Sequence, residues 1–378
     1  MSKNNSYFNN IFKKCNPWDS SSSEFDDEDI ITKNFKELYF FKDLMNKSSS
    51  LSWNLIQNNK KIIKEKKLKP KFSDKPISLI NDDDVRCYMN AALQALLPTL
   101  DISITSKIKD NRLMDKPVCH LLNAFLSSYS KQCSFNIKKH IRNYSKLSYF
   151  GSQFSWNYQE DSHEFLTSLL DKLKDELEQF SKENNITNQV SESFELKHEA
   201  TLYCKNCHKT KNGNTNISSD FGLMLEIDKN FDTMLERTLI HDIEDFTCEK
   251  CDTEKGTFEA RINILSLPKN LIICIKRFGF DSSYNSYKIN HPVELEETIE
   301  VPLSINNDTE MVKYELVSII CHLGTLASGH YTSFVKINGE WYLANDKDIS
   351  DVTFSEIVDI TLGKNYVHIY KKLKLESQ

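Results

Sequence analysis

The sequence predicts an α+β protein, because helical and strand-like patterns occupy different parts of the chain. Two stretches, Cys87–Leu97 and Asp161–Phe180, repeat apolar residues every three or four positions, which is the spacing of an amphipathic helix. Between Ile262 and Asp346, apolar residues instead alternate with polar ones, which is the spacing of half-buried strands. Helices and strands that are segregated along a chain are typical of the α+β class.

The composition is that of a globular protein. Of the 378 residues, 39% are hydrophobic, enough for a core, and the formal charge of −6 gives no overall attraction to nucleic acid or to an anionic membrane. No apolar run approaches the roughly 18 residues that cross a bilayer, and no apolar signal segment follows Met1. We therefore expect a cytoplasmic or nuclear protein, in which the ten cysteines serve as thiols, metal ligands or a nucleophile.

Residues 1–73 differ in composition from the rest of the chain. An Asn-rich start is followed by serines, by an acidic run at residues 24–29 and by a lysine-rich run at residues 60–71. Such composition is typical of disordered segments, and the lysine run is more simply a solvated linker than a nuclear address. We predict an extension or linker that is largely disordered over residues 1–73, and a folded domain over residues 74–374.

Cys87 opens the first predicted helix, which Pro98 ends. The unpaired N–H groups and the positive dipole end at a helix start favour a thiolate and offer donors to a substrate oxygen. A cysteine nucleophile would be placed here, although a buried structural cysteine explains this stretch equally well. The apolar residues expected on one face of the helix are Met89, Ala92, Leu93, Leu96 and Leu97.

The second predicted helix begins in a cluster of polar residues. Asp161, followed three positions later by Glu164, forms the pattern of a capping box. This structural interpretation leaves Gln159 and Glu160 unexplained, so a polar contact with a substrate is an alternative role for this end of the helix. His163 lies in the first turn and could be taken for a catalytic base, but a later histidine is the better candidate.

Four cysteines form two C-x-x-C pairs, Cys204 with Cys207 and Cys248 with Cys251. Four thiolates are the tetrahedral set of a structural zinc ion, which leaves no open coordination position for chemistry. The C-x-x-C-H pattern that ends at His208 could also attach haem, but this would require an exported protein and would not explain the second pair. We expect a structural Zn²⁺ that stabilises an insertion.

A β-hairpin is predicted around an Asn-Gly turn at residues 338–339, the strongest two-residue turn signal. Counting outward from this turn places His330 and Asn345 on one face as diagonal neighbours, within reach of each other. Asp346 faces the other way unless the strand bulges. Together with Cys87, a histidine and a group that orients it make the minimum set of a thiol hydrolase.

In their order along the chain, these motifs resemble the ubiquitin-specific proteases. The resemblance spans about residues 77–372. It is carried by five features. These are the cysteine box (Cys87–Leu96), the Gln-x-Asp-x-His-Glu-Phe-Leu segment (Gln159–Leu166), the paired C-x-x-C knuckles (residues 204–251), two short apolar–basic motifs (Leu267–Lys269 and Lys276–Phe278) and the histidine box (residues 314–346).

The resemblance implies a papain-like cysteine protease palm and thumb, with a β-rich, zinc-bearing fingers insertion at about residues 194–262. It further implies a thiol-dependent deubiquitinase that hydrolyses the peptide or isopeptide bond after the C-terminal glycine of ubiquitin. The implied partners are ubiquitin and ubiquitinated proteins, with neither nucleic acid nor membrane expected. The implied cofactor is the structural Zn²⁺ at the four cysteines.

The resemblance also implies the roles of individual residues. Cys87 corresponds to the nucleophile, His330 to the base and Asn345 to the residue that orients it, with Asp346 beside them. The residues expected to contact the C-terminal tail of ubiquitin are Gln159, Asp161, Glu164 and Tyr331.

The loop before Cys87 departs from the family pattern Gly-Leu-x-Asn-x-Gly-Asn-Thr. Here residues 82–84 are all aspartates, and a strict count places Asp82 where the family has the Asn of its oxyanion hole. A one-residue insertion would restore Asn81 to that place. Carboxylates here would oppose both a thiolate and an oxyanion. A catalytically weak or inactive ubiquitin-binding scaffold is therefore the alternative, and a zinc-stapled adaptor unrelated to ubiquitin is a further one.

Overall fold

The computed structural model describes residues 75–141, 149–150, 154, 158–210, 217–228, 230–251, 253–280, 286–305, 308–325 and 328–373. The predicted linker at residues 1–73 lies outside the described residues. The chain divides into two compact units, and each is considered by itself. The described part of the smaller unit comes from residues 278–288 and 322–330, and the larger unit contains the rest.

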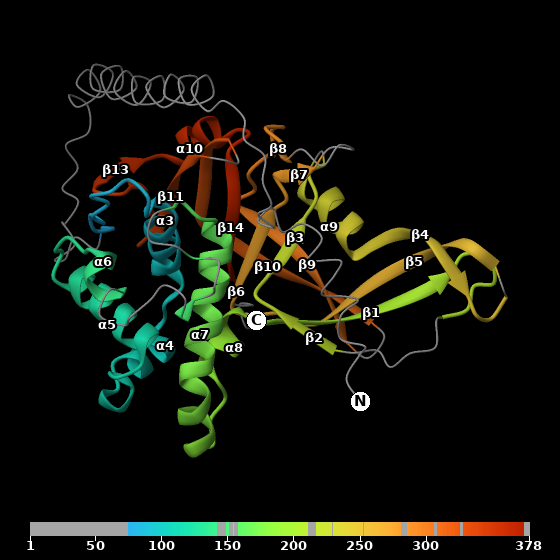
Figure 1. The fold of residues 1–378 in the computed structure, drawn as a ribbon, viewed down its shortest axis with the longest axis horizontal. Helices are drawn as coiled ribbons and strands as arrows, with labels where there is room; N and C mark the ends of the chain where they lie inside the picture. The colour runs from blue at the N-terminus through green and yellow to red at the C-terminus, as the bar shows by residue number, and fades with distance from the viewer. Residues whose placement is uncertain are drawn as a thin grey trace, which may run out of the picture. The chain divides into compact units, whose positions relative to one another are not determined.

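Both predicted helices are confirmed, and shorter ones surround them (Figure 1). Within the described part of the chain, no helix is both long enough and apolar enough to cross a membrane. The helices and 3₁₀ turns are α3 (Cys87–Leu96), η1 (Leu97–Thr99), α4 (Ile102–Ile108), η2 (Asn111–Leu113), α5 (Pro117–Ser130), α6 (Ile137–Ile141), α7 (Ser162–Glu183), α8 (Gln189–Phe194), α9 (Phe231–Leu239) and α10 (Phe354–Thr361).

The strands form three sheets, so the predicted α+β class is confirmed. An eight-stranded sheet has the order β13-β12-β11-β10-β14-β6-β3, with β9 also paired to β10; a four-stranded sheet has the order β2-β1-β5-β4; and β7 pairs with β8. The strands are β1 (Leu196–Cys204), β2 (Ile217–Asp220), β3 (Leu223–Leu225), β4 (Ile240–Cys248), β5 (Thr253–Ser266), β6 (Asn270–Ile275), β7 (Phe278–Phe280), β8 (Ser286–Lys288), β9 (Thr298–Ile305), β10 (Asp308–Gly324), β11 (Gly329–Ile337), β12 (Glu340–Asn345), β13 (Asp348–Val352) and β14 (Asn365–Lys372).

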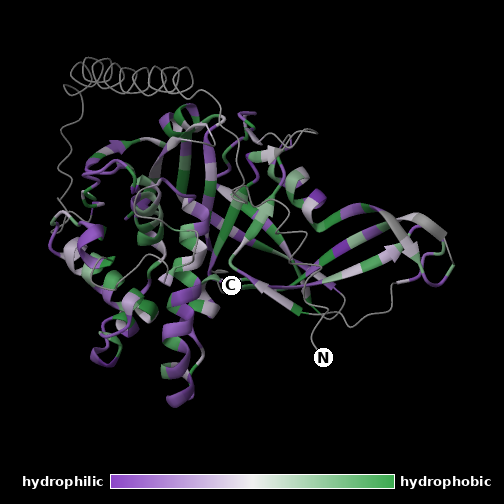
Figure 2. Ribbon diagram, in the orientation of Figure 1, coloured by the Kyte–Doolittle hydropathy of each residue, from purple (hydrophilic) through white to green (hydrophobic). Residues whose placement is uncertain are grey.

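Within the larger unit, α3 to α8 gather on one side of the eight-stranded sheet, and β1, β4 and β5 extend from its other side (Figure 1). Hydrophobic residues concentrate on the central strands, whereas the far end of α7 is hydrophilic (Figure 2). This pattern fits a sheet whose central strands, such as β6, are buried at every residue.

The apolar face predicted for α3 is buried, and so is the rest of the helix, since all ten of its residues are buried. α3 packs between α7 and β12, and the Tyr88 ring meets the edge of Phe165 at a centroid distance of 5.6 Å. A helix covered from several sides must also place its polar side chains inside the protein, and here these are Asn90 and Gln94. Each of them donates a hydrogen bond, Asn90 to Asp346 and Gln94 to a backbone carbonyl.

A buried carboxylate on α7 caps the start of α5. Glu176 accepts hydrogen bonds from the backbone N–H groups of Val118 and Cys119, at 2.9 and 2.8 Å, and from the Tyr149 hydroxyl. The residue before α5, Lys116, supplies no side-chain cap of its own. Glu176 therefore does from another helix what an N-cap residue normally does locally.

Arg277, in one of the motifs that resemble the family, has a structural role. Its guanidinium is fully buried and donates to the backbone carbonyls of Ile289 and His291, at 3.0 and 2.9 Å, and to both the backbone and side-chain oxygens of Asn365. These bonds tie the segment after β8 to the start of β14. Burial lowers the pKa of Arg277 to about 10, which leaves it charged at neutral pH.

Candidate active site

Cys87 is the first residue of α3, as predicted, and its side chain is buried. Backbone N–H groups of Tyr331, Tyr88 and Cys87 itself lie close enough to its sulfur to lower the pKa of the thiol. Two of these donors belong to the helix start, and the third comes from β11. A sulfur surrounded by backbone donors occupies the kind of place where an anion is stabilised.

The expected stabilisation of the Cys87 thiolate is not found in this state of the protein. Burial raises the pKa of the thiol to about 12, because removing a charge from water costs more than the three N–H groups restore. The carboxylate of Asp346 raises it further. The N–H groups at the helix start lower the pKa, as predicted, but the packing around Cys87, which the sequence does not state, sets the direction of the net shift.

The predicted hairpin is confirmed in its register and its turn. Ile337 pairs with Glu340, and the ladder continues to Ser333 opposite Ala344. Both turn residues at 338–339 have positive φ, at 52° and 85°, as this type of two-residue turn requires. β12 ends at Asn345. His330 lies in the smaller unit and Asn345 in the larger, so their pairing stays a prediction.

Asp346 follows the end of β12 with a φ of 52°, and its carboxylate is close enough to Cys87 to raise the pKa of the thiol. Its two carboxylate oxygens accept hydrogen bonds from Asn81, at 2.9 Å, and from Asn90, at 2.7 Å. Its backbone oxygen accepts from the N–H of Leu79. These partners were missed at the sequence level; the one signal for them was a polar residue, Asn90, in a helix of buried positions.

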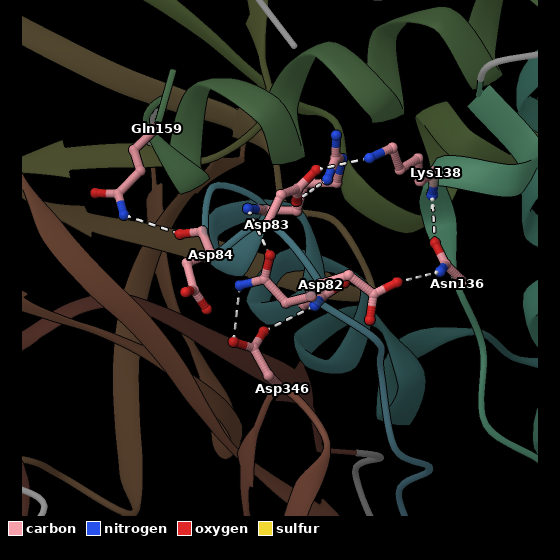
Figure 3. Close-up of polar contacts among 10 residues, drawn as sticks. Asp82, Asp83, Asp84, Asn136, Lys138, Gln159 and Asp346 are labelled. Carbon is pink, nitrogen blue, oxygen red and sulfur yellow. Dashed lines mark hydrogen bonds and ion pairs between the residues drawn. The ribbon is translucent and has the colours of Figure 1, made fainter. Parts of the chain in front are cut away.

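The two oxyanion candidates are placed differently, and Figure 3 shows one of them, Asp82, near Asn136. The Asn81 oxygen accepts from the backbone N–H of Arg86 at 3.0 Å, so the carboxamide lies at the start of α3. Asp82 is exposed, and its carboxylate is turned toward Asn136. Of the two, Asn81 therefore occupies the position beside the start of α3.

Asp84 holds a left-handed backbone conformation, with a φ of 56°. This conformation costs most residues roughly 1–2 kcal/mol, although Asp and Asn adopt it more readily than others. Asp84 stands where the family pattern has a glycine, which adopts this conformation freely. Gln159 donates to the Asp84 carbonyl at 3.1 Å and so connects this turn to the segment before α7 (Figure 3).

Asp161 is the N-cap of α7, as predicted, since its Oδ1 accepts from the backbone N–H groups of His163 and Glu164. Its Oδ2 accepts from the Tyr331 hydroxyl at 2.9 Å, and the Tyr366 hydroxyl is a further partner. The same Tyr331 donates its backbone N–H to the Cys87 sulfur. Asp161 thus holds in place a residue that contacts Cys87.

Glu164 carries a carboxylate that the protein leaves incompletely paired. Its Oε2 is buried and has no hydrogen-bond partner among the described residues. Desolvation, followed by the charges of Asp161 and Glu160, raises the pKa of Glu164 to about 7. A cation placed beside this group would reverse that shift. Burial lowers the pKa of the neighbouring His163, which packs against the Tyr366 ring, in keeping with a structural role.

The four cysteines of the C-x-x-C pairs meet at one end of the four-stranded sheet, where β1 and β4 finish. Their sulfur atoms all lie within 4.8 Å of one another, with 3.9 Å between Cys204 and Cys251 and 3.8 Å between Cys207 and Cys248. A tetrahedral ion with bonds of about 2.3 Å separates its ligands by about 3.8 Å, whereas a disulfide needs about 2.05 Å. The arrangement fits a single tetrahedral metal ion.

The model of the family described as ubiquitin carboxyl-terminal hydrolase matches residues 79–370 of this chain. Among curated proteins, the chain is 31% identical over 231 residues to Ubiquitin carboxyl-terminal hydrolase 21 of Arabidopsis thaliana, covering 56% of this chain and 30% of that protein. It is 26% identical over 325 residues to Ubiquitin carboxyl-terminal hydrolase 24 of Mus musculus, covering 71% of this chain and 12% of that protein. The chain thus spans less than a third of the length of either relative.

Among solved structures, the SAGA Ubp8/Sgf11/Sus1/Sgf73 DUB module bound to ubiquitin aldehyde matches with a TM-score of 0.62 and 19% identity, covering 88% of this chain and 76% of that one. A structure of the SAGA DUB module bound to monoubiquitin matches with the same TM-score, the same coverage and 20% identity. At such identity the likeness shows a shared fold.

Proposed function

Because the chain belongs to the ubiquitin carboxyl-terminal hydrolase family, as one of its ubiquitin-specific proteases, we propose that it is an active, thiol-dependent deubiquitinase. The observation that carries the proposal is the environment of Cys87, which begins a buried helix with its sulfur against the backbone N–H of Tyr331, the residue that follows His330.

In this mechanism the Cys87 sulfur attacks the carbonyl carbon of the C-terminal glycine of ubiquitin. His330 accepts the thiol proton and passes it to the departing amine, which leaves a thioester on Cys87. Water, deprotonated by His330, then releases ubiquitin with a free C-terminus. Since burial keeps the thiol protonated in the free protein, the attack requires this proton transfer rather than a standing thiolate.

We assign the oxyanion hole to the Asn81 amide and the backbone N–H of Cys87. The Asn81 amide donates to Asp346 in this structure, and its oxygen is held by Arg86. These two bonds set the orientation of the carboxamide before substrate arrives. Asp346 accepts a hydrogen bond from the Asn81 amide and so orients it. Asn345 remains our candidate for orienting His330.

For the ubiquitin tail we propose a division of labour among Gln159, Asp161, Glu164 and Tyr331. Asp161 is already bound by two N–H groups and two phenols, so it acts by holding Tyr331. Glu164, with a buried oxygen that lacks a partner among the described residues, is the better receptor for an arginine of the tail.

We propose that Cys204, Cys207, Cys248 and Cys251 hold a structural Zn²⁺. The ion would supply four strong bonds where β1 and β4 end, far along the chain from Cys87, and would take no part in the hydrolysis. The four-stranded sheet stabilised in this way is our candidate for the fingers that grip ubiquitin. Ubiquitin and ubiquitinated proteins are the proposed partners, in the cytoplasm or nucleus.

The proposal is tested with ubiquitin that carries an electrophile at its C-terminus. A covalent adduct at Cys87, together with turnover of a ubiquitin–fluorophore substrate that Cys87→Ser and His330→Ala abolish, is the expected result. The raised pKa of Cys87 favours one rival, an inactive ubiquitin-binding scaffold. Ubiquitin binding with no adduct and no turnover would establish that rival instead.

A further inference from the structure

The three aspartates before Cys87 are each tied to a neighbouring segment of the larger unit (Figure 3). Asp82 accepts from Asn136, which lies just before α6, and the Asp84 carbonyl accepts from Gln159, just before α7. The Asp83 carboxylate is bound by Lys138 of α6 at 2.9 Å and by Arg86. The loop is therefore held by the carboxylates of Asp82 and Asp83 and by the backbone carbonyl of Asp84.

Asp83 lies between two cations. Desolvation raises the pKa of its carboxyl, but the hydrogen bonds and charges of Arg86 and Lys138 outweigh this and keep the pKa below its ordinary value. The Arg86 side chain is only 4% exposed. A guanidinium that is buried to this extent is costly unless a carboxylate pairs with it. Asp83 supplies such a partner, and Lys138 anchors that partner to α6.

Arg86 connects this ion pair to the active site. It is the residue immediately before Cys87, at the N-cap of α3, and its backbone N–H donates to the Asn81 oxygen. Fixing Arg86 therefore fixes both the start of the nucleophile's helix and the orientation of the Asn81 amide. The residues on either side of Asp83 are held by one hydrogen bond each. Asn136 Nδ2 donates to Asp82 Oδ2 at 3.4 Å, and Gln159 donates to the Asp84 carbonyl.

We propose that Asp83 and Lys138 are positioning residues that keep the loop in the register in which Asn81, and not Asp82, stands beside Cys87. A slip of one residue would exchange an amide donor for a carboxylate. An oxyanion hole that loses one donor is slower by about 10²–10³, and a fixed negative charge adds repulsion. This inference rests on the proposed function for its consequence in catalysis, but not for the geometry of the loop.

The first test compares Lys138→Met with Lys139→Met, a matched control that removes an exposed lysine from the same helix. Lys138→Met is expected to lower kcat on ubiquitin–fluorophore by about 3- to 5-fold, the effect of one half-exposed ion pair, while KM stays within about twofold. Lys138→Arg should restore kcat. Asp83→Asn removes this carboxylate from the buried guanidinium of Arg86 and should lower kcat by about tenfold or more.

The second test asks whether the loss comes from a slipped loop. In the Lys138→Met background, adding Asp82→Asn should recover activity, because a slipped loop would then present an amide in place of a carboxylate. Equal kcat for Lys138→Met and Lys139→Met, or a loss that neither Lys138→Arg nor Asp82→Asn recovers, would overturn the inference.

Hydrogen exchange separates this inference from the proposed function. In the free protein, Lys138→Met should speed exchange of the Arg86 amide, which donates to Asn81, and Lys139→Met should not. If the wild type turns over no ubiquitin substrate but this exchange difference is found, the function is wrong and the loop anchor is right. If the wild type is active and the exchange rates of the two variants agree, the loop anchor is wrong.

Discussion

Cys87 has two environments that act on its thiol in opposite directions. The backbone donors at the start of α3 favour a thiolate, while burial and the Asp346 carboxylate disfavour it and prevail. A cysteine that stays protonated is protected from adventitious oxidation and alkylation, since the thiolate is the reactive form. We therefore expect Cys87 to be unreactive in the free protein.

We expect alkylation of Cys87 by iodoacetamide in the free protein to be slow at neutral pH and to rise with pH well beyond the range of an ordinary thiol. Asp346→Asn should lower the pKa of Cys87, because it removes a nearby negative charge. Mass spectrometry of the Cys87 peptide measures both rates, and the exposed Cys133 confirms that the reagent is active. If the alkylation rate of Cys87 had the same pH dependence in Asp346→Asn as in the wild type, Asp346 would not be a cause of the raised pKa.

Turnover distinguishes the two oxyanion candidates. Asn81→Ala is expected to lower kcat by about 10²–10³, because it removes a donor at the start of α3. Asp82→Asn is expected to cost much less, because Asp82 is exposed and turned toward Asn136. If Asp82→Asn instead raises turnover and Asn81→Ala does not lower it, the loop works in the other register.

Glu164 predicts a pH dependence of ubiquitin binding. Its pKa in the folded protein is raised to about 7, so the protonated form stabilises the fold below the ordinary carboxyl pKa, and this contribution is lost as pH rises through 7. An arginine of the ubiquitin tail would favour the ionised form. Affinity should therefore rise between about pH 6 and 8, with release of a proton on binding.

Calorimetry of Cys87→Ala with ubiquitin, in two buffers of different ionisation enthalpy, measures this proton. The release at pH 7 should disappear in Glu164→Gln. Persistence of the same release in Glu164→Gln would show that another group accounts for it.

At the scale of single elements, α7 connects three parts of the larger unit. Its N-cap holds Tyr331, its buried face packs on α3, and Glu176 caps α5. The polar side chains of α7 bind residues of other elements. Another amphipathic helix with the same apolar residues would therefore not replace it. Its hydrophobic spacing predicted its existence, but not these connections.

The α5 cap gives a stability prediction. Glu176→Ala should lower the free energy of unfolding by about 1–3 kcal/mol, because two backbone N–H groups of α5 and a tyrosine hydroxyl lose their acceptor. Asp175→Asn removes an exposed carboxylate one position away and should change it by about 0.5 kcal/mol or less. Urea denaturation compares the two, and equal midpoints would mean that the cap contributes nothing.

At the scale of the whole molecule, the cysteine cluster lies where β1 and β4 end. In Figure 1 this end of the four-stranded sheet points away from helices α3 to α8. Loss of metal should therefore loosen the end of this sheet without changing the surroundings of Cys87. We expect about one zinc per chain in the purified protein, and Cys248→Ser should lose it.

The two measurements that follow from this separation are the affinity for ubiquitin and the alkylation rate of Cys87. Zinc removal should lower the affinity for ubiquitin by a larger factor than it changes the alkylation rate of Cys87. A purified protein without zinc, or a Cys248→Ser variant with full zinc content, would refute the site.

Local patterns in the sequence were enough for the helices after residues 86 and 161, the hairpin register around residues 338–339 and the four-cysteine cluster. Each of these depends on spacing within a few residues or on the conformational freedom of a turn, which the sequence states directly. Family resemblance added the proposal that Cys87 is the nucleophile and His330 the base, and both their roles and their mutual placement stay predictions.

Tertiary structure alone decided the chemistry around these elements. The pKa of Cys87, the contact of Asp346 with Asn81 and the Tyr331 bond to Asp161 join residues from distant parts of the chain. Their meeting is set by how helices pack on a sheet, and no local pattern contains that information. Burial, which prevailed over the helix start at Cys87, is likewise a property of everything that surrounds a residue rather than of the residue itself.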